Sequence, residues 1–353
     1  MKDDLVKGSR WSTSRSSFHV HPSSSQRSVQ VILPRSSFIL LGVLLLLPFE
    51  ATAADQYPSR PVRLIVGQPA GGNADMTARV YGQKLGERLG VQFVVDNRGG
   101  AGGVIATDLT VRAQPDGYTL FVAHTAVGTN PALIGKLPFD TRRDLAPVSL
   151  LVVGPNIVVV AAGSPVKSIG DLIAAARARP GKINYSSSGV ATSTHVSGEL
   201  FKAMAKVNLQ HVAYKGAPAS MIAVATGESE VSFAGMAGAL PLVRGGRLRG
   251  IAVTGEKRFP PLPDLPTVAE SGVPGYESVA WYALFGPARL PGPTVDLLYR
   301  EVAAISQAQD TRSRMIAEGL ETMGTTPREL AAFLGHEIEK WTRLAKTAGL
   351  SAN

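Results

Sequence analysis

Residues 62–89 read VRLIVGQPAGGNADMTARVYGQKLGERL, and this stretch decides the fold class. Its first five residues form a short apolar run that is typical of a buried strand. After the Gly71-Gly72 turn, apolar residues recur at helical spacing, namely Ala74, Ala78, Tyr81, Leu85 and Leu89. A strand that passes through a tight turn directly into a helix is the repeating unit of α/β proteins.

The same unit repeats along the chain. Further strands are predicted at 93–95, 118–123, 183–185, 209–214, 231–233 and 248–254, with helical patterns between many of them. Alternating strands and helices predict a mostly parallel α/β sheet. The alternation restarts after the apolar run 150–162, which Gly154-Pro155-Asn156 interrupts, and two successive α/β sets predict two domains.

The C-terminal part of the chain is expected to return to the first domain. A strand-like run at 279–285 is followed by residues predicted to be helical, which must cover a sheet already built. The chain would then cross between domains twice, and two crossings make a hinge. We predict that domain 1 comprises residues 55–155 plus 278–353 and that domain 2 comprises residues 156–277.

The first 54 residues have the pattern of a leader that is removed. Arg35 precedes an apolar run at 38–49, which is shorter than the ~20 residues of a membrane span. Small residues follow at once, so the segment is predicted to be a cleavable signal peptide with cleavage after Ala53 or Ala54. The alternative is a buried core helix. A signal peptide places the mature protein in the periplasm.

Composition excludes several classes of function. The chain of 353 residues has no cysteine, which excludes disulfides, thiolate nucleophiles and cysteine metal sites. The formal net charge is +9, and without residues 1–54 it is 36 − 6 = 30 positive against 27 − 3 = 24 negative, or +6. No basic run with interleaved aromatic residues suggests nucleic-acid binding. The six histidines show no metal-ligand spacing, so neither a metal nor a cofactor is expected.

The loop 69–75 joins the first strand to its helix and is a candidate anion site. Helix N-termini leave backbone N–H groups free and carry a partial positive charge, and glycines let an anion approach them. The alternative is a tight turn without a ligand. Asp75 could act as a base, although an early-turn aspartate more often complements the helix dipole. The candidate ligand-binding residues here are Gln68, Ala70, Gly71, Gly72 and Asp75.

The loop 185–195, YSSSGVATSTH, repeats this arrangement in the second domain. Seven of the residues from Ser186 to Thr194 are Ser, Thr or Gly, more than one helix cap needs, although a cap cluster is the alternative. The candidate ligand-binding residues are Ser187, Ser188, Gly189, Ala191, Thr192 and Ser193. His195 invites a serine–histidine nucleophile, but no G-x-S-x-G motif is present, so no catalytic residue is predicted.

Two further candidate pairs end predicted strands. His124 and Thr125 end the third strand, where α/β sheets place ligands. Ala234 and Gly235 end a second-domain strand in the same way.

Taken together, these loops resemble one family, the tripartite tricarboxylate transporter receptors, also called Bordetella uptake gene (Bug) receptors. The resemblance extends from Tyr57 to about Leu350. Its motifs, in order, are YPSRPVRLIV at 57–66, DNR at 96–98 with GAGG at 100–103, PDGYTL at 115–120, NPAL at 130–133, PGKINY at 180–185, YKG at 214–216 and LPDLPTVAE at 262–270.

The resemblance implies a type II periplasmic-binding-protein fold, in which two α/β domains are joined by two crossing strands. It also implies that loops of both domains hold a ligand carboxylate, partly through water. Relatives commonly carry Pro and an aromatic residue where this chain has Gly67 and Gln68, so Gln68 is expected to help set ligand choice. Many carry Asp-Asn where this chain has Ala234-Gly235, which argues against an amino-acid ligand.

The predicted function is therefore capture of a small carboxylate solute in an interdomain cleft, for transporter subunits in the membrane. The chain is expected to act as a monomer and not as an enzyme. Two alternatives stay open, a ligand sensor that uses the same fold for a signalling partner and a hydrolase that uses a loop serine.

Overall fold

The structure is a computed structural model that describes residues 57–348, so the predicted leader at 1–54 lies outside the described residues. The strands are β1 Val62–Val66, β2 Phe93–Asn97, β3 Thr119–His124, β4 Leu145–Ala161, β5 Asn184–Ser187, β6 Gln210–Ala213, β7 Val231–Gly235, β8 Leu248–Val253, β9 Val279–Pro287 and β10 Glu321–Thr322. The α-helices are α2 Asn73–Leu89, α3 Val104–Val111, α4 Ala126–Leu133, α5 Ile169–Ala178, α6 Ser193–Ala205, α7 Ala217–Thr226, α8 Met236–Arg244, α9 Gly292–Gln307, α10 Gln309–Ala317 and α11 Pro327–Ala348.

The strands of residues 57–348 pair in the order β2-β1-β3-β9-β4-β7-β5-β6, with β8 and β10 also pairing β4. We call β1, β2, β3 and β9, with helices α2 to α4 and α9 to α11, the first lobe. Strands β5 to β8 with α5 to α8 form the second lobe. Neighbours within each lobe are largely parallel, as predicted, whereas β9 and β4 run antiparallel to their partners.

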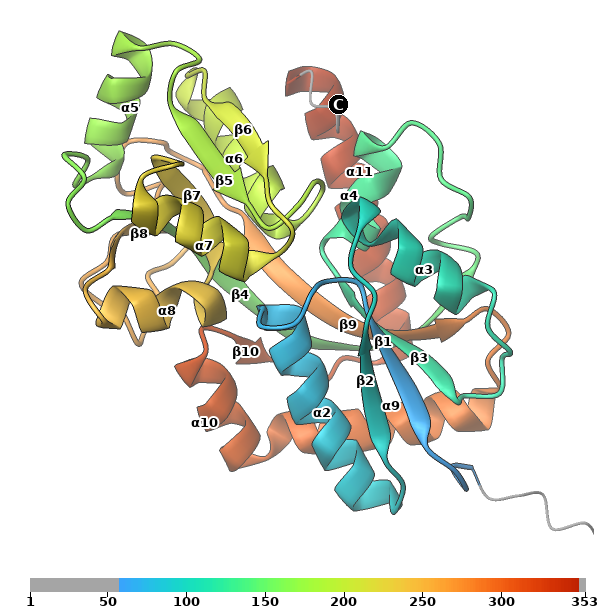
Figure 1. Ribbon diagram of the computed structural model, residues 1–353. Coiled ribbons are helices and arrows are strands. Elements are labelled where there is room, and N and C mark those ends of the chain that lie inside the picture. The colour runs from blue at the N-terminus through green and yellow to red at the C-terminus, as the bar shows by residue number, and fades with distance from the viewer. Residues whose placement is uncertain (1–56, 349–353) are drawn as a thin grey trace, which may run out of the picture. The chain divides into compact units, whose positions relative to one another are not determined.

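Strand β4 serves both lobes, and Figure 1 shows it crossing with β9 between the two strand groups. Its first part, through Pro155, pairs with β9, and from Asn156 onward it pairs with β7 and β8. The strand is 17 residues long and continuous, so the predicted interruption at 154–156 does not end it. We propose that the two predicted domains meet at this point of β4, between Pro155 and Asn156.

A buried polar network lies where β4 stops pairing with β9 and begins to pair with β7 and β8. The Asn156 backbone N–H donates to Thr254 Oγ1 at 2.7 Å, and Asn156 Nδ2 donates to Ser197 Oγ at 3.0 Å. Ser197 Oγ contacts Ser278 Oγ at 2.8 Å, and Thr254 Oγ1 donates to the Ser278 carbonyl at 2.6 Å. All four side chains are fully buried. Asn156 Oδ1 has no partner among the described residues, but the other hydrogen bonds of the network connect β4 with Thr254 and Ser278 and so fix how the two crossing segments lie.

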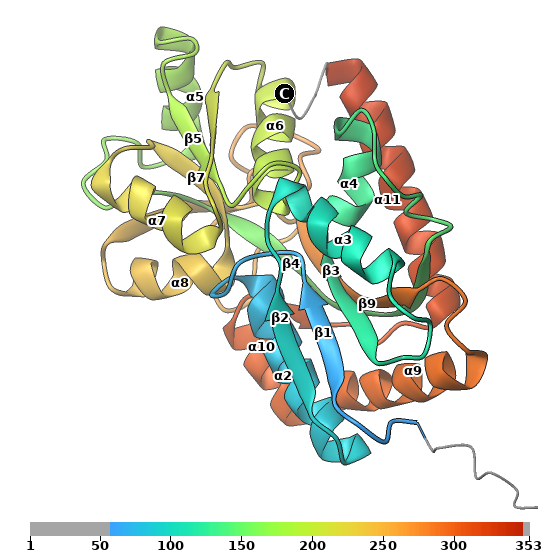
Figure 2. The ribbon, with the colours of Figure 1, turned by 45° about the vertical axis from the view of Figure 1, so that its right-hand side comes forward.

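The C-terminal helices pack on the first lobe, as the sequence predicts. Helix α9 contacts α2 and β4, and α11 contacts β4 and α4, beside which both views place it (Figure 2). Residues of α9 and α10 join the core formed by β1, α2 and β3, and residues of α11 join a second core that contains Trp281. Within residues 57–348, no helix combines the length and apolar character that a membrane span requires.

Four elements are absent from the sequence prediction: α4, α7, α8 and β10. Proline explains two of these helices, because it disfavours helix interiors and hides their periodicity. Pro131 lies inside α4, and Pro241 lies inside α8. In α7 the proline lies in the first turn, where helices tolerate it, and the mostly small apolar residues leave no amphipathic pattern. Strand β10 is only two residues long, and it forms by pairing with β4.

Two histidines stack in the core of the second lobe. The His211 ring lies 4.8 Å from the Tyr185 ring and 4.2 Å from the His195 ring, measured between centroids. Burial lowers the pKa of His195 to about 4, helped by the charge of Lys202. Burial also lowers the pKa of His211 to about 3, with His195 adding to the effect. Both rings are therefore neutral at neutral pH.

We expect Asn156→Ala to lower the free energy of unfolding by about 1–3 kcal/mol, because it removes the hydrogen bond that Asn156 Nδ2 donates to the buried Ser197 hydroxyl. Urea unfolding followed by tryptophan fluorescence measures this. Thr141→Val is the control, because the Thr141 hydroxyl is buried without a partner among the described residues. An Asn156→Ala variant as stable as Thr141→Val would contradict a structural role for the network.

Acid should destabilise the fold before its carboxylates titrate. In the unfolded chain each histidine binds a proton near pH 6.5, whereas in the folded chain His195 and His211 bind one only at pH 3 to 4. The free energy of unfolding therefore falls as the pH drops from about 6.5 toward 4. Between pH 7 and pH 5 the loss should be on the order of 1–2 kcal/mol for each buried histidine. His211→Gln should shrink the difference between urea midpoints at the two pH values, and the exposed His336→Gln should not.

Candidate functional site

Two adjoining cavities lie where the lobes meet. The larger has a volume of about 930 Å³ and the smaller about 20 Å³, room for roughly one water molecule. Both are lined by Gln68 and Pro69 of the first lobe and by Ser188 and Gly216 of the second. The β1–α2, β5–α6 and β6–α7 connections supply these residues, and the first two are the loops singled out by sequence.

Four helix N-termini surround the small cavity. Its lining includes the N-cap residues of α2, α7 and α8, which are Gly72, Gly216 and Gly235, and the first residue of α6, Ser193. None of these four helices has a side-chain cap hydrogen bond. Their N-terminal N–H groups and partial positive charges thus converge on one space, and no charged side chain is among the residues that line it.

Asn73 links the lobes and aims a donor at the small cavity. Its side chain is 4% exposed, and its Oδ1 accepts a hydrogen bond from the Ala237 backbone N–H of α8 at 3.1 Å. Nδ2 has no partner among the described residues. Since Oδ1 is committed to Ala237, the amide presents N–H groups, not oxygen, to the cavity that Asn73 lines.

The hydroxyls of the β5–α6 loop mainly hold the loop itself. Thr192 Oγ1 donates to the Gly189 carbonyl at 2.6 Å, and Thr194 Oγ1 accepts from the Ser188 backbone N–H at 2.9 Å. Burial raises the pKa of the Tyr282 hydroxyl, and the neighbouring Ser193 opposes this rise. The loop is therefore a rigid frame for backbone donors, and Ser193 and Tyr282 meet at the small cavity.

The residues that line the large cavity differ in type from those that line the small one. Glycines and small apolar residues supply much of its lining, and Lys215, which is exposed, is the one charged residue among those that line it. The imidazole of His124 also lines this cavity. No aspartate or glutamate lines either cavity, so neither presents a carboxylate to a ligand.

Asp75 stabilises the β1–α2 loop without lining either cavity. Its carboxylate accepts from the Gly71 backbone N–H at 3.1 Å and pairs with Arg79. Burial opposes ionisation, but hydrogen bonds from Arg79 and Gly71 outweigh it and lower the Asp75 pKa. Asp75 is thus ionised and paired, which favours the dipole-complementing role over that of a base.

The predicted residues fall into two groups. Those that line a cavity are Gln68, Gly72, His124, Ser188, Gly189, Thr192, Ser193 and Gly235. Those that line neither are Ala70, Gly71, Asp75, Thr125, Ser187, Ala191 and Ala234. In the second group the Thr125 hydroxyl accepts from the Trp281 N–H, the Ala191 carbonyl accepts from Thr129 across the lobes, and Ala234 is buried in a core cluster. Their contact with a ligand remains a prediction.

A serine–histidine contact does occur, but not the one weighed from sequence. Ser187 Oγ lies 2.7 Å from His211 Nε2, whereas His195 accepts from the Ala191 backbone N–H through Nδ1. Ser187 is fully buried, so its hydroxyl is closed to a substrate. The contact therefore supports the loop and does not make a nucleophile.

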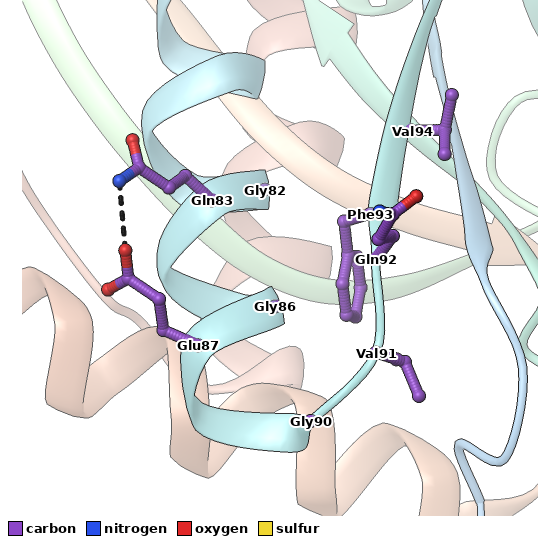
Figure 3. Close-up of a pocket in the computed structure, with 9 residues that line it drawn as sticks. All are labelled: Gly82, Gln83, Gly86, Glu87, Gly90, Val91, Gln92, Phe93 and Val94. Atoms are coloured by element: carbon purple, nitrogen blue, oxygen red, sulfur yellow. Dashed lines mark hydrogen bonds between the residues drawn. The ribbon is translucent and has the colours of Figure 1, made fainter.

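A third hollow of about 580 Å³ lies between α2 and β2 and has no comparable chemistry. Figure 3 shows Gln83 and Glu87 bonded to each other on the helix, away from the facing strand. Gly82 and Gly86 face the strand, where a Cβ would lie 2.9 Å from a Leu64 methyl carbon or from the Val91 carbonyl oxygen. This hollow reflects close helix–strand packing and not a converging set of donors.

Sequence reasoning missed several lining residues, namely Asn73, Asn97, Thr194, Lys215, Gly216 and Tyr282. Asn73 lies inside the candidate loop 69–75, and Lys215-Gly216 lies inside the YKG motif at 214–216. The sequence therefore pointed to the positions of these three residues. Tyr282 lies in the apolar run of β9, and only the pairing of β9 with β3 brings it to the site.

The comparisons with known proteins agree with this geometry. Residues 77–350 match the model of the tripartite tricarboxylate transporter family receptor. Protein BugT of Bordetella pertussis is 31% identical over 299 residues, which cover 84% of this chain and 92% of that protein.

Two solved structures from Rhodopseudomonas palustris are similar over most of their length. Rpa4515 with adipate has a TM-score of 0.82 and 35% identity, covering 84% of this chain and 99% of that one. MatC with bound malate has a TM-score of 0.78 and 28% identity, covering 82% and 99%. The two-domain α/β fold of periplasmic binding proteins, expected from the resemblance, is therefore confirmed. The chain belongs to the tripartite tricarboxylate transporter receptor family.

Proposed function

We propose that this protein captures a small organic carboxylate between its lobes in the periplasm and passes it to a membrane transporter of the tripartite type. The observation that carries the proposal is the convergence of four helix N-termini on one small cavity that no charged side chain lines. Charge-assisted hydrogen bonds from such donors suit a carboxylate group. The relatives solved with adipate and malate support the same ligand class.

We propose that one oxygen of the carboxylate takes the place of a water molecule in the small cavity, with the rest of the ligand in the large one. The two spaces share Gln68, Pro69, Ser188 and Gly216, so they are continuous at these residues. The absence of aspartate and glutamate from both linings argues against a ligand amine. Gln68 borders both spaces, and we propose that it helps choose among carboxylates.

Ligand binding is proposed to favour the closed arrangement of the lobes. Thr129 Oγ1 donates to the Ala191 carbonyl at 2.7 Å, and Asn73 accepts from Ala237, so contacts across the lobes lie beside both ligand loops. A ligand that touches donors of both lobes interacts better with the closed state than with an open one, which is the condition for a population shift. Nothing in this scheme requires a catalytic residue, and we propose a binding role without catalysis.

Asn73→Asp should weaken carboxylate binding at least about 100-fold, because it turns a buried donor into an unpaired like charge. Titration calorimetry with adipate, malate and citrate on wild type and variant measures this. Gln92→Glu, the same type of charge change at an exposed site, is the control. If no carboxylate binds wild type, or if Asn73→Asp binds as well as Gln92→Glu, the small cavity is not a carboxylate site.

The double variant Thr192→Ala with Ser193→Ala should weaken binding by about 1–3 kcal/mol, because loss of these hydroxyls loosens the loop whose backbone donors bond the charged group, and hydrogen bonds to a charged group are on this scale. It should also stay more open at ligand concentrations that saturate wild type, as measured by small-angle scattering with and without ligand. Ser313→Ala, an exposed serine of α10, is the control. A double variant that binds and compacts like wild type would leave these hydroxyls with no role beyond hydrogen bonding within the loop.

A further inference from the structure

Lys215 carries the one charge among the residues that line the large cavity. It lies in the β6–α7 connection and is exposed. None of the ion pairs between residues of 57–348 includes it, and no aspartate or glutamate lines the cavity. An ammonium group without a carboxylate partner keeps its charge available to a ligand.

The course of the chain places this side chain on the cavity side. The N–H groups of Tyr214 and Gly216 both donate to backbone carbonyls of the β5–α6 loop, at 3.0 and 3.2 Å. The side chain of Tyr214 is directed to the α7–β7 turn, where its hydroxyl donates to Glu228 at 2.7 Å. Side chains alternate along an extended segment, so Lys215 lies on the face of Ala213, and both residues line the large cavity.

Lys215 is also next to the proposed carboxylate site. Gly216, the following residue, borders both the small and the large cavity. Consecutive Cα atoms are about 3.8 Å apart, and the flexible stem of a lysine extends its ammonium further. A ligand with one carboxylate oxygen in the small cavity therefore passes Gly216 and brings its far end within reach of Lys215.

The first-lobe wall of the large cavity offers no competing charge. Residues 99–104 supply much of this wall, and they are four glycines with Ala101 and Val104. None of these side chains can pair with a charged group of the ligand. The sign of charge that is favoured at the far end of the ligand is therefore set by Lys215, because a cleft with uncharged walls focuses the field of the charge it contains.

We propose that Lys215 is a specificity-determining residue whose ammonium group pairs with a second anionic group at the far end of the ligand. The site then prefers a dianionic acid to the monocarboxylate of the same chain length. Because the lysine is exposed, the pair contributes less than a buried one would, and salt weakens it. This inference rests on the proposed function.

Titration calorimetry with matched pairs of acids tests it. The pairs are succinate against butyrate, glutarate against valerate and adipate against hexanoate, on wild type, Lys215→Gln and Lys215→Glu. Wild type should prefer the dianion of at least one pair roughly threefold to tenfold, the scale of a partly exposed ion pair. Lys215→Gln should cut this preference to about twofold or less while the monocarboxylate still binds, and Lys215→Glu should reverse it.

Salt separates an effect of charge from an effect of shape. Raising the ionic strength from about 20 mM to about 500 mM should weaken the preference of wild type for the dianion, because exposed charges are screened. Lys215→Arg should keep both the preference and its salt dependence, whereas Lys215→Gln should show neither. Lys167→Gln removes an exposed lysine just before α5, away from both cavities, and is the control that should behave as wild type.

Two results would overturn the role of Lys215 while the carboxylate site stands. One is wild type that binds the monocarboxylates as well as the dianions, and the other is an unchanged preference in both Lys215→Gln and Lys215→Glu. If no acid of the panel binds wild type, the proposed function fails, and this inference fails with it.

Discussion

The structure depends on one strand that belongs to two sheets. Strand β4 pairs with β9 through Pro155 and with β7 and β8 from Asn156 onward, so both lobes share a single backbone. The buried hydrogen bonds of Asn156 to Thr254 and Ser197 hold the point of change. Because parallel strands end at a common edge in each lobe, this shared strand brings the two sets of strand-end loops face to face.

The site is made mainly of backbone, which explains its composition. Gly72, Gly216 and Gly235 are N-caps without a side chain, so no cap residue occupies the first N–H groups of their helices, although in α8 the Ala237 N–H donates to Asn73 Oδ1. The hydroxyls of the β5–α6 loop bond to one another and to the loop backbone, which fixes the donors in place. Rigid donors that need no rearrangement make an anion site effective.

Sequence patterns predicted the elements and both ligand loops, but not which residues of those loops face a cavity. Ala70 and Gly71 lie in the first loop and line neither cavity, while the neighbouring Asn73 does. Within a loop, side-chain direction follows from local turns and from contacts such as that of Asn73 with Ala237, which lies 164 residues away. No periodic pattern reports such a contact, and helices that contain proline were missed for the same lack of pattern.

The sequence by itself determined the α/β class, the order of most strands and helices, the family and the two glycine- and serine-rich loops, because these follow from local spacing and residue type. Only the tertiary structure decided that four helix N-termini meet at one cavity and that Tyr282 lies opposite His124. These features arise from pairing between strands far apart in the chain. Such pairing depends on the packing of whole lobes, which no local stretch of sequence encodes.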